Sequence, residues 1–239
     1  MSAPEAHCPA WVLHRRPYGE TGALVELFTR EHGRLGAVAR GARRRGWGGL
    51  LEPFVPLHAA WRGRGELKTI TDLEQAGAGY RLRGEALACG FYMAELLLAM
   101  TRREDPHPRT WEAYAVGLDA LTGPAEPALR RFELALLAES GYGLRLEEDV
   151  HGAPIAAERP YRYAPERGPE PLEPDEAGEA GGACLHGATL LALATGEGLA
   201  EEPVRSEARR LMRTVLSHRL GGRRLRSREL FRSFRKPHQ

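Results

Sequence analysis

The sequence predicts an α+β protein of several domains, in which a five-stranded β-barrel at the N-terminus is followed by an all-α domain with an irregular insert. Three observations lead to this prediction. Residues up to about 80 follow the two-residue period of β-strands, the next stretch changes to the 3.6-residue period of an α-helix, and a later segment is too rich in Pro, Gly and Glu to show either. The 239 residues suffice for one large domain or two or three small ones.

The barrel is predicted from five short runs of apolar or β-branched residues separated by turn-like segments. The runs are WVLH (11–14), ALVELFT (23–29), LGAVA (35–39), FVPLHAAW (54–61) and LKTITDLE (67–74). The separating segments RPYGETG, EHGR and RGRGE, together with an Arg/Gly run, are typical of turns. Five strands at this spacing favour a small antiparallel barrel, of which the oligonucleotide-binding (OB) fold is a common type. The pattern leaves an SH3-like barrel as an alternative.

The helical part begins near residue 82. Within residues 82–100, apolar side chains recur at steps of four, three and four, as on one stripe of a helix: Leu87, Phe91, Ala94 and Leu98. Further helices are predicted at 110–121 and 127–141, the latter with Pro127 in its first turn and Gly141 as its C-terminal cap. Helices are also predicted over 187–196, 203–222 and 227–234, with Ser227 as the N-cap of the last.

The segment 150–183 carries few large apolar side chains among many Pro, Gly and Glu residues. Because such a segment buries too little surface to offset its ordering entropy, we expect an irregular and mobile insert. The predicted organisation is therefore a barrel domain at 1–80, a helical domain at 81–149 and 184–239, and the insert at 150–183.

Composition limits the class of protein. The formal net charge is only +2, but both ends of the chain are basic and the middle is acidic. Three widely spaced cysteines, Cys8, Cys89 and Cys184, do not form a disulfide framework and fit a reducing compartment. No apolar stretch is long enough to span a bilayer, and the N-terminus lacks the pattern of a signal peptide. We therefore expect a cytoplasmic protein with no membrane partner.

The sequence lacks the common enzymatic and metal-binding motifs. The chain has no Walker loop, no G-x-G-x-x-G after a strand, no H-E-x-x-H and no G-x-S-x-G. Structural zinc needs four Cys or His ligands, usually in two close pairs, whereas this chain offers Cys184 and His186 with an isolated His151. We expect no catalytic residues, no metal and no cofactor.

The Arg/Gly run ARGARRRGWGG (39–49) is the most suggestive local feature. A surface rich in arginine binds nucleic acid without reading sequence, because each neutralised phosphate releases condensed counterions. Trp47 and Trp61 are candidates for stacking on unpaired bases, and the alternative is that Trp61 faces the barrel core while the arginines are a solvated loop. The basic side chains expected around one barrel are Arg15, Arg16, Arg40, Arg43, Arg44, Arg45, Arg62, Arg64 and Lys68.

Two further basic clusters lie in the helical part. The C-terminal GGRRLRSRELFRSFRK is either a packed amphipathic helix or a second binding surface, and arginine-rich faces can be both. Arg130 and Arg131 lie on a helix beside Phe132, Leu136 and Leu137. This segment is an ordinary helix face, or a groove in which an acidic, aromatic-ended peptide docks by arginine–carboxylate pairing.

Nearly the whole chain resembles the RecO family of bacterial recombination-mediator proteins. The segments that carry the resemblance are VLHRRPYGETGALVELFTREHGRLGAVARGAR (12–43), LEPFVPLHAAWRGRGELKTITDLE (51–74), YMAELLLAM (92–100), EPALRRFELALLAESGYG (126–143) and GGRRLRSRELFRSF (221–234). The most specific motifs are RPYGETG, RGAR, GRGELKT and PALRRFELALL, which occur in the family's order.

The resemblance implies an N-terminal OB fold, a helical domain and a zinc-finger-like insert. Many members carry four zinc-binding cysteines there, whereas this chain keeps only Cys184, so it is similar to the branch that lacks the metal. The residues that the resemblance and the basic clusters together assign to DNA are Arg15, Arg16, Arg40, Arg43, Arg44, Arg45, Arg64, Lys68, Arg223 and Arg224. Those assigned to the C-terminal tail of single-stranded DNA-binding protein (SSB) are Arg130, Arg131, Phe132 and Leu136.

The function implied is that of a non-catalytic mediator of DNA repair and homologous recombination in the cytoplasm, associated with the nucleoid. Such a protein binds single- and double-stranded DNA, anneals complementary strands, binds the SSB tail, and with RecR promotes loading of RecA. The alternative is a protein-interaction adaptor whose basic surfaces bind acidic proteins and not DNA.

Overall fold

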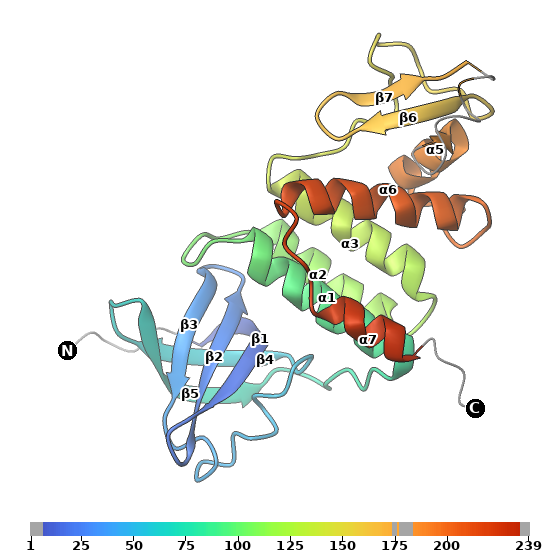
Figure 1. Ribbon diagram of the computed structural model, residues 1–239. Coiled ribbons are helices and arrows are strands. Elements are labelled where there is room, and N and C mark those ends of the chain that lie inside the picture. Colours follow the sequence, from blue (N-terminus) through green and yellow to red (C-terminus); the bar gives the residue numbers. More distant parts are fainter. Residues whose placement is uncertain (1–6, 174–175, 177–183, 235–239) are drawn as a thin grey trace. The chain divides into compact units, whose positions relative to one another are not determined.

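The computed structural model describes residues 7–173, 176 and 184–234 (Figure 1). The chain divides into two compact units, one made of Met1–Asp119 with Leu225–Gln239 and the other of Ala120–Arg224. The boundaries of these units differ from those of the three predicted domains. The three-domain division stays a prediction. Among the described residues, no helix is both long enough and apolar enough to cross a membrane.

The first unit contains a closed five-stranded barrel. Its strands are β1 (Cys8–Tyr18), β2 (Gly22–Thr29), β3 (Gly33–Ala39), β4 (Leu57–Arg62) and β5 (Leu67–Gln75). They follow one another around the barrel in the order β1-β2-β3-β5-β4, and β4 returns to β1. All neighbours are antiparallel except β3 and β5, which are parallel. The arrangement confirms the predicted OB-fold barrel.

Alternation of side chains explains why these residues form strands. Val25 and Leu27 of β2 are buried inside the barrel, as are Leu35 and Ala37 of β3, while the residues between them face outward. β1 is longer than predicted because it continues through the Arg15–Arg16–Pro17 segment. β4 pairs only with residues 8–10 of β1, so the far end of β1 is bonded on one side, where proline is tolerated.

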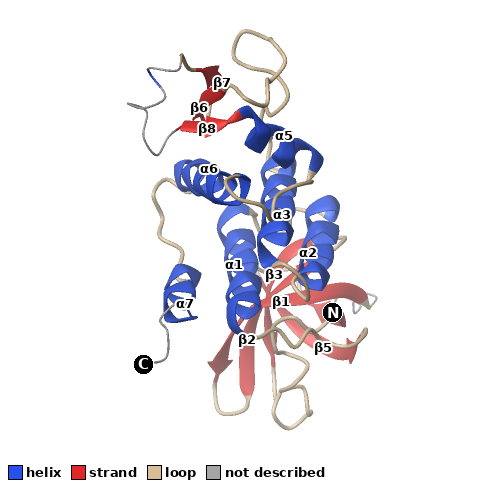
Figure 2. Cartoon of the chain, turned by 90° about the vertical axis from the view of Figure 1, so that its right-hand side faces the viewer, coloured by secondary structure: helices blue, strands red, loops and turns tan. Residues whose placement is uncertain are grey.

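Three helices complete the first unit: α1 (Gly84–Met100), α2 (Pro108–Ala120) and α7 (Ser227–Phe234) (Figure 2). α2 packs on the outer face of the barrel through Tyr114, which is fully buried. The Tyr114 ring meets the rings of Trp11 and Phe28 edge to face, with centroids 5.8 and 6.5 Å apart. Burial alone raises the pKa of Tyr114. An apolar barrel surface is thus covered by helix.

The last helix has an N-terminal cap that the sequence did not indicate. Ser227 was predicted to cap α7, but it is the first helical residue, and the capping acceptor is Glu95 of α1. The Glu95 carboxylate accepts the backbone N–H groups of Arg226 and Ser227 at 2.8 Å each, and the Ser227 hydroxyl at 2.7 Å. A carboxylate at this helix end is favoured by the helix dipole.

The second unit contains α3 (Ala125–Glu139), α5 (Gly187–Thr195), α6 (Val204–Arg219) and a small sheet. Pro127 lies in the first turn of α3, as predicted. Gly141 follows the helix with φ of 77°, and Tyr142 N–H donates to the Leu137 carbonyl, which closes the end in a Schellman-type turn. The helices predicted at 127–141, 187–196 and 203–222 are confirmed with small shifts at their ends.

Part of the segment predicted to be an irregular insert forms a regular sheet, so that prediction was wrong for residues 160–164 and 168–171. β6 (Pro160–Ala164), β7 (Gly168–Pro171) and β8 (Cys184–His186) form an antiparallel sheet in the order β7-β6-β8. Residues 174–175 and 177–183 lie outside the described residues.

Two tyrosines explain why this sheet forms despite a composition poor in apolar residues. Tyr161 and Tyr163 are buried, and their hydroxyls accept the backbone N–H groups of Ala156 and Arg145 at 3.0 and 3.1 Å. Each side chain therefore contributes apolar burial and satisfies a backbone donor. Average composition over a window does not register two residues used in this way.

Candidate nucleic-acid interface

The outer face of the barrel carries a row of residues that the strand register places side by side. Arg16 lies opposite Leu24, Leu24 opposite Val38, and Val38 beside Thr69, which in turn lies opposite Arg62. We call these five residues the arginine row, because an exposed arginine stands at each end. Strands are spaced by about 4.8 Å, so the row follows a curved path of roughly 19 Å around the closed barrel.

A second, shorter row lies nearer the β1–β2 turn. Tyr18 stands two residues beyond Arg16 and therefore on the same face of β1, and it pairs with Gly22. Ala23 pairs with Ala39, so Arg40, the next residue, continues the register beside Gly22. Tyr18 and Arg40 are both exposed. Strands 2 and 3 and the β1–β2 loop are the parts of an OB fold that bind oligonucleotides.

The Arg/Gly run is a folded loop that is fastened to the barrel. Arg43 donates its backbone N–H to the Thr21 carbonyl at 3.1 Å, which joins the loop to the β1–β2 turn. Arg15 donates to the Gly48 carbonyl at 3.1 Å and pairs with Glu52 at 2.5 Å. Arg45 donates to the Thr71 carbonyl at 3.1 Å. Three of the predicted DNA-binding arginines therefore also act as anchors of this loop.

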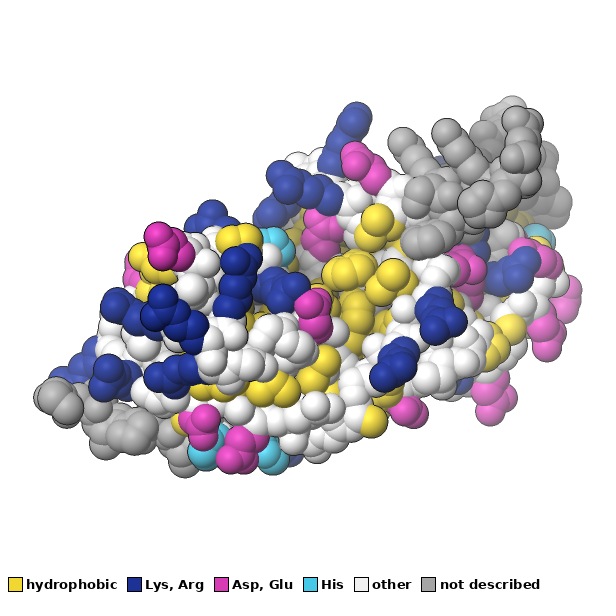
Figure 3. All heavy atoms as spheres, turned by 90° about the horizontal axis from the view of Figure 1, so that it is seen from below, with side chains coloured by type: hydrophobic (Ala, Val, Ile, Leu, Met, Phe, Trp, Pro, Cys, Tyr) yellow, Lys and Arg dark blue, Asp and Glu magenta, His cyan; other side chains and the backbone are white. Residues whose placement is uncertain are grey.

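The other arginines that the sequence predicts around the barrel lie apart from such partners among the described residues. Within the described residues, no hydrogen bond or ion pair engages the exposed side chains of Arg16, Arg40, Arg44, Arg62 and Arg64. Figure 3 shows Lys and Arg side chains gathered over the barrel at the left of the view. Guanidinium groups without a carboxylate partner keep their full charge for an anion.

The two tryptophans expected to stack on bases are buried. Trp47 and Trp61 are 7% and 4% exposed and belong to the barrel core. The guanidinium of Arg45 covers the Trp47 ring at 4.7 Å from its centroid, and His32 meets Trp61 edge to face. The stacking role proposed for them is therefore wrong, and core packing, the alternative for Trp61, applies to both.

The Lys68 side chain, also predicted to bind DNA, is buried and paired within the protein. It is 7% exposed, donates to the Gly65 carbonyl at 3.0 Å and pairs with Glu104 at 2.6 Å. Its ammonium fastens the β4–β5 loop to the segment after α1. Lys68 thus has its charge matched within the unit.

Arg103, which the sequence did not single out, lies over the face of β2 and β3. Its side chain pairs with Glu26, and a Cβ on Gly36 would come 2.9 Å from the Arg103 Cζ. Hydrogen bonding to Glu26 raises the pKa of Arg103 against the opposing effect of burial. Gly36 is the sequence signal for the position of Arg103, since a glycine within a strand often marks a site where another group approaches closely.

The candidates in the second unit fall into two groups. Arg223 and Arg224 are exposed after α6. Arg130, Phe132 and Leu136 are 5%, 1% and 0% exposed, so these three are core residues of α3. Arg131 is exposed and donates to the Gly196 carbonyl at 2.9 Å.

Arg130 belongs to a buried charge network. It lies 2.9 Å from Glu133 and 3.8 Å from Glu126, and Glu126 also pairs with Arg209 of α6. The Arg130 guanidinium therefore neutralises carboxylates within the unit. Glu126 and Glu133 stand at helical spacing from Arg130, so the sequence allows both pairs. Arg209 joins Glu126 only through the fold, because it is distant in sequence.

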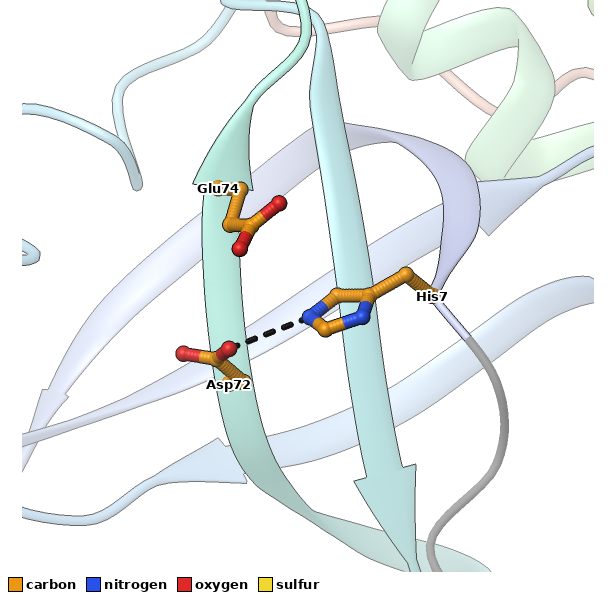
Figure 4. A group of neighbouring side chains, drawn as sticks. All are labelled: His7, Asp72 and Glu74. Atoms are coloured by element: carbon orange, nitrogen blue, oxygen red, sulfur yellow. Dashed lines mark hydrogen bonds and ion pairs between the residues drawn. The ribbon is translucent and has the colours of Figure 1, made fainter.

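One group of side chains has the composition of a cation site. His7, at the start of β1, and Asp72 and Glu74, on one face of β5, place one ligand atom each within 4.8 Å of one another (Figure 4). His7 Nε2 is 3.1 Å from Asp72 Oδ2. The group is solvent-facing and offers three ligands, whereas structural zinc takes four. We assign it no metal.

Sequence comparisons place the chain in a known family. The family models "Recombination protein O N terminal" and "Recombination protein O C terminal" match residues 1–78 and 81–229. The chain is 68% identical over 230 residues to the DNA repair protein RecO of Halorhodospira halophila, covering 95% of this chain and 97% of that protein. It is 55% identical to the DNA repair protein RecO of Alkalilimnicola ehrlichii, covering 94% and 90%, respectively. The chain therefore belongs to the recombination protein O family.

Proposed function

We propose that this protein is a DNA repair and recombination mediator that binds single- and double-stranded DNA on the outer face of its barrel. The observation that carries the proposal is the set of exposed guanidinium groups around an OB-fold barrel, those of Arg16, Arg40 and Arg44, which have no partner among the described residues. Relatives that share most of their length with this chain are named DNA repair proteins.

The chemistry of this face suits a phosphate backbone. The guanidinium is a planar, permanently charged donor that pairs with phosphate in two-pronged geometry. Arg16 and Arg62 of the arginine row, together with Arg40 and Arg44 of the same barrel, offer several exposed positive charges to a phosphate backbone. Such binding is weak in sequence preference and falls steeply with salt.

Annealing would follow without any covalent step. Two complementary strands repel each other through their phosphates, and a surface that neutralises some of these charges brings the strands together at high local concentration. The proposed mechanism uses no catalytic residue, metal or cofactor. The side chains act as positioned charges, and base pairing supplies the free energy.

The second unit is proposed to capture the acidic C-terminal tail of SSB, and the protein with RecR to promote RecA loading. Of the predicted tail residues, Arg131 supplies an exposed guanidinium, while Arg130, Phe132 and Leu136 support the helix that carries it. The carboxylates of an acidic peptide would pair with Arg131.

The test of DNA binding is fluorescence anisotropy of a labelled oligonucleotide with the purified chain alone. In an Arg16→Ala/Arg40→Ala/Arg44→Ala variant, we expect affinity at low salt to fall by roughly tenfold or more. The slope of log affinity against log salt should become shallower by about 2, since each single-strand phosphate contact contributes roughly 0.7. The matched control is Arg81→Ala/Arg83→Ala/Arg213→Ala, which removes three exposed charges elsewhere. Equal losses in the two variants would contradict the proposed face.

A protein-interaction adaptor is the second candidate, since arginine-rich surfaces also bind acidic proteins. The same titration distinguishes the two. If the wild-type chain, free of partners, binds no oligonucleotide at low salt, DNA binding is wrong and the adaptor is favoured.

A further inference from the structure

Tyr18 is an exposed aromatic side chain on the face that the proposed function assigns to DNA. It is 54% exposed, and the other exposed large apolar side chain of the barrel, Leu67, is not aromatic. Burial of Trp47 and Trp61 removes them as stacking surfaces. A phenol ring that stays in water beside exposed arginines has no role in core packing, so the ring is accessible to a ligand.

In the row formed by Tyr18, Gly22 and Arg40, the position beside Tyr18 is occupied by a residue without a side chain. Gly22 is its cross-strand partner and has no side chain. A Cβ at Gly22 would come 2.7 Å from the Tyr18 carbonyl oxygen and 3.2 Å from that of Ala39, so the strands approach too closely there for a larger residue. No side chain therefore stands between Tyr18 and Arg40 in this row, while Arg16 stands two residues back along β1.

The turn that carries Tyr18 is held in place. The backbone N–H of Arg43 donates to the Thr21 carbonyl at 3.1 Å, and the Arg43 guanidinium donates to the Glu20 carbonyl at 3.4 Å. Gly19 takes a φ of 61°, which the tight turn requires. The backbone beneath the ring is thus positioned before any ligand arrives, which lowers the entropy cost of binding.

We propose that Tyr18 is a stacking platform for an unpaired base, with Arg16 and Arg40 holding the flanking phosphates. The inference rests on the proposed DNA-binding function and adds a specificity-determining residue to it. Bases in a duplex already stack on their neighbours, so they present no free face to the Tyr18 ring. Tyr18 therefore favours single strands, whereas the arginines serve single and double strands alike.

The experiment compares Tyr18→Ala, Tyr18→Leu and Tyr18→Phe on a single-stranded oligothymidine and on a duplex of equal length, by anisotropy. Tyr18→Ala and Tyr18→Leu should each weaken single-strand binding by about tenfold, within the range of one base–aromatic stack. Tyr18→Phe should stay within about twofold of wild type, because it keeps the ring face. Duplex affinity should be unchanged in all three. Circular dichroism melting checks that each variant is folded, which the exposure of Tyr18 favours.

A second readout uses an oligothymidine of the same length in which a run of consecutive bases has been removed. On this abasic ligand, the difference in affinity between wild type and Tyr18→Ala should shrink toward zero. Equal losses on single strand and duplex, or wild-type affinity in Tyr18→Ala, would overturn the stacking platform while DNA binding by the arginines stands. A wild-type chain that binds no DNA would instead remove the proposed function and this inference together.

Discussion

The barrel and helix α3 both carry arginines that the sequence predicts to be functional, and the structure uses them in opposite ways. Arg16, Arg40 and Arg44 of the barrel are exposed and have no partner among the described residues. Arg130 of α3 is buried between carboxylates. A guanidinium that already neutralises an internal charge stabilises the fold, and one without a partner is available to an outside anion. An arginine therefore indicates binding only once its partners are known.

The largest expected effect concerns Arg130. Arg130→Ala should lower the free energy of unfolding by about 3 kcal/mol, because Glu133 would be left buried without its cation. Arg131→Ala, beside it on the same helix, should cost less than about 1 kcal/mol, since its guanidinium is exposed. Urea denaturation followed by circular dichroism measures both. Similar stabilities for the two variants would contradict the assignment of Arg130 to a buried charge network and of Arg131 to the surface.

A buried carboxylate in the same unit provides a pH-dependent version of this test. Burial opposes ionisation of Glu207, but hydrogen bonds from the Thr189 hydroxyl and from the backbone and ring of His186 outweigh it, so the pKa of Glu207 is lowered. A lowered folded pKa gives stability that is present above the ordinary value and lost as pH falls through the folded value.

Glu207→Gln should therefore destabilise the chain by about 1 to 2 kcal/mol at pH 7, because the charged acceptor is lost. The gap between wild type and variant should narrow as the pH is lowered below the ordinary glutamate range. Thermal melts at a series of pH values measure this. A gap that is constant with pH would mean that Glu207 is not stabilised as a carboxylate.

Arg15, which anchors the Arg/Gly loop from β1, and Arg44 within the loop should differ in experiment. Arg15→Ala removes contacts to Gly48 and Glu52 and should cost about 1 kcal/mol of stability. Arg44→Ala should leave the melting temperature unchanged and weaken DNA binding by about threefold, as expected for one phosphate contact at low salt. Melting and anisotropy on both variants give the comparison. If Arg44→Ala lowered stability as much as Arg15→Ala, Arg44 would be an anchor of the loop and not a side chain available to phosphate.

The smallest effect is expected at the β4–β5 loop. Lys68→Met should change DNA affinity by less than about twofold, because its ammonium is already paired with Glu104 and hydrogen-bonded to the Gly65 carbonyl. Arg64→Ala, four residues earlier and exposed, should weaken binding more at low salt. Anisotropy at two salt concentrations decides the order. The reverse order would show that Lys68 leaves its internal partner to meet phosphate.

Local patterns were a good guide wherever neighbours in sequence decide the structure. The two-residue alternation in ALVELFT and LGAVA predicted β2 and β3, and Pro127 and Gly141 marked the ends of α3. The cap of α7 was misassigned because the acceptor, Glu95, is distant in sequence. The sheet around Tyr161 was missed because two buried tyrosines outweigh an unfavourable average composition.

The candidate interface divides along the same line. Arginine-rich turns around a five-stranded barrel can be identified in the amino-acid order, because strand period and turn chemistry are local properties. Which guanidinium groups face solvent depends on cross-strand register and on carboxylates and carbonyls contributed by distant segments, such as Glu52 and the Gly48 carbonyl for Arg15. The burial of Trp47 and the exposure of Tyr18 were decided in the same way. Charge and aromatic content belong to the chain, and their availability to a ligand arises only when folding assigns each group its neighbours.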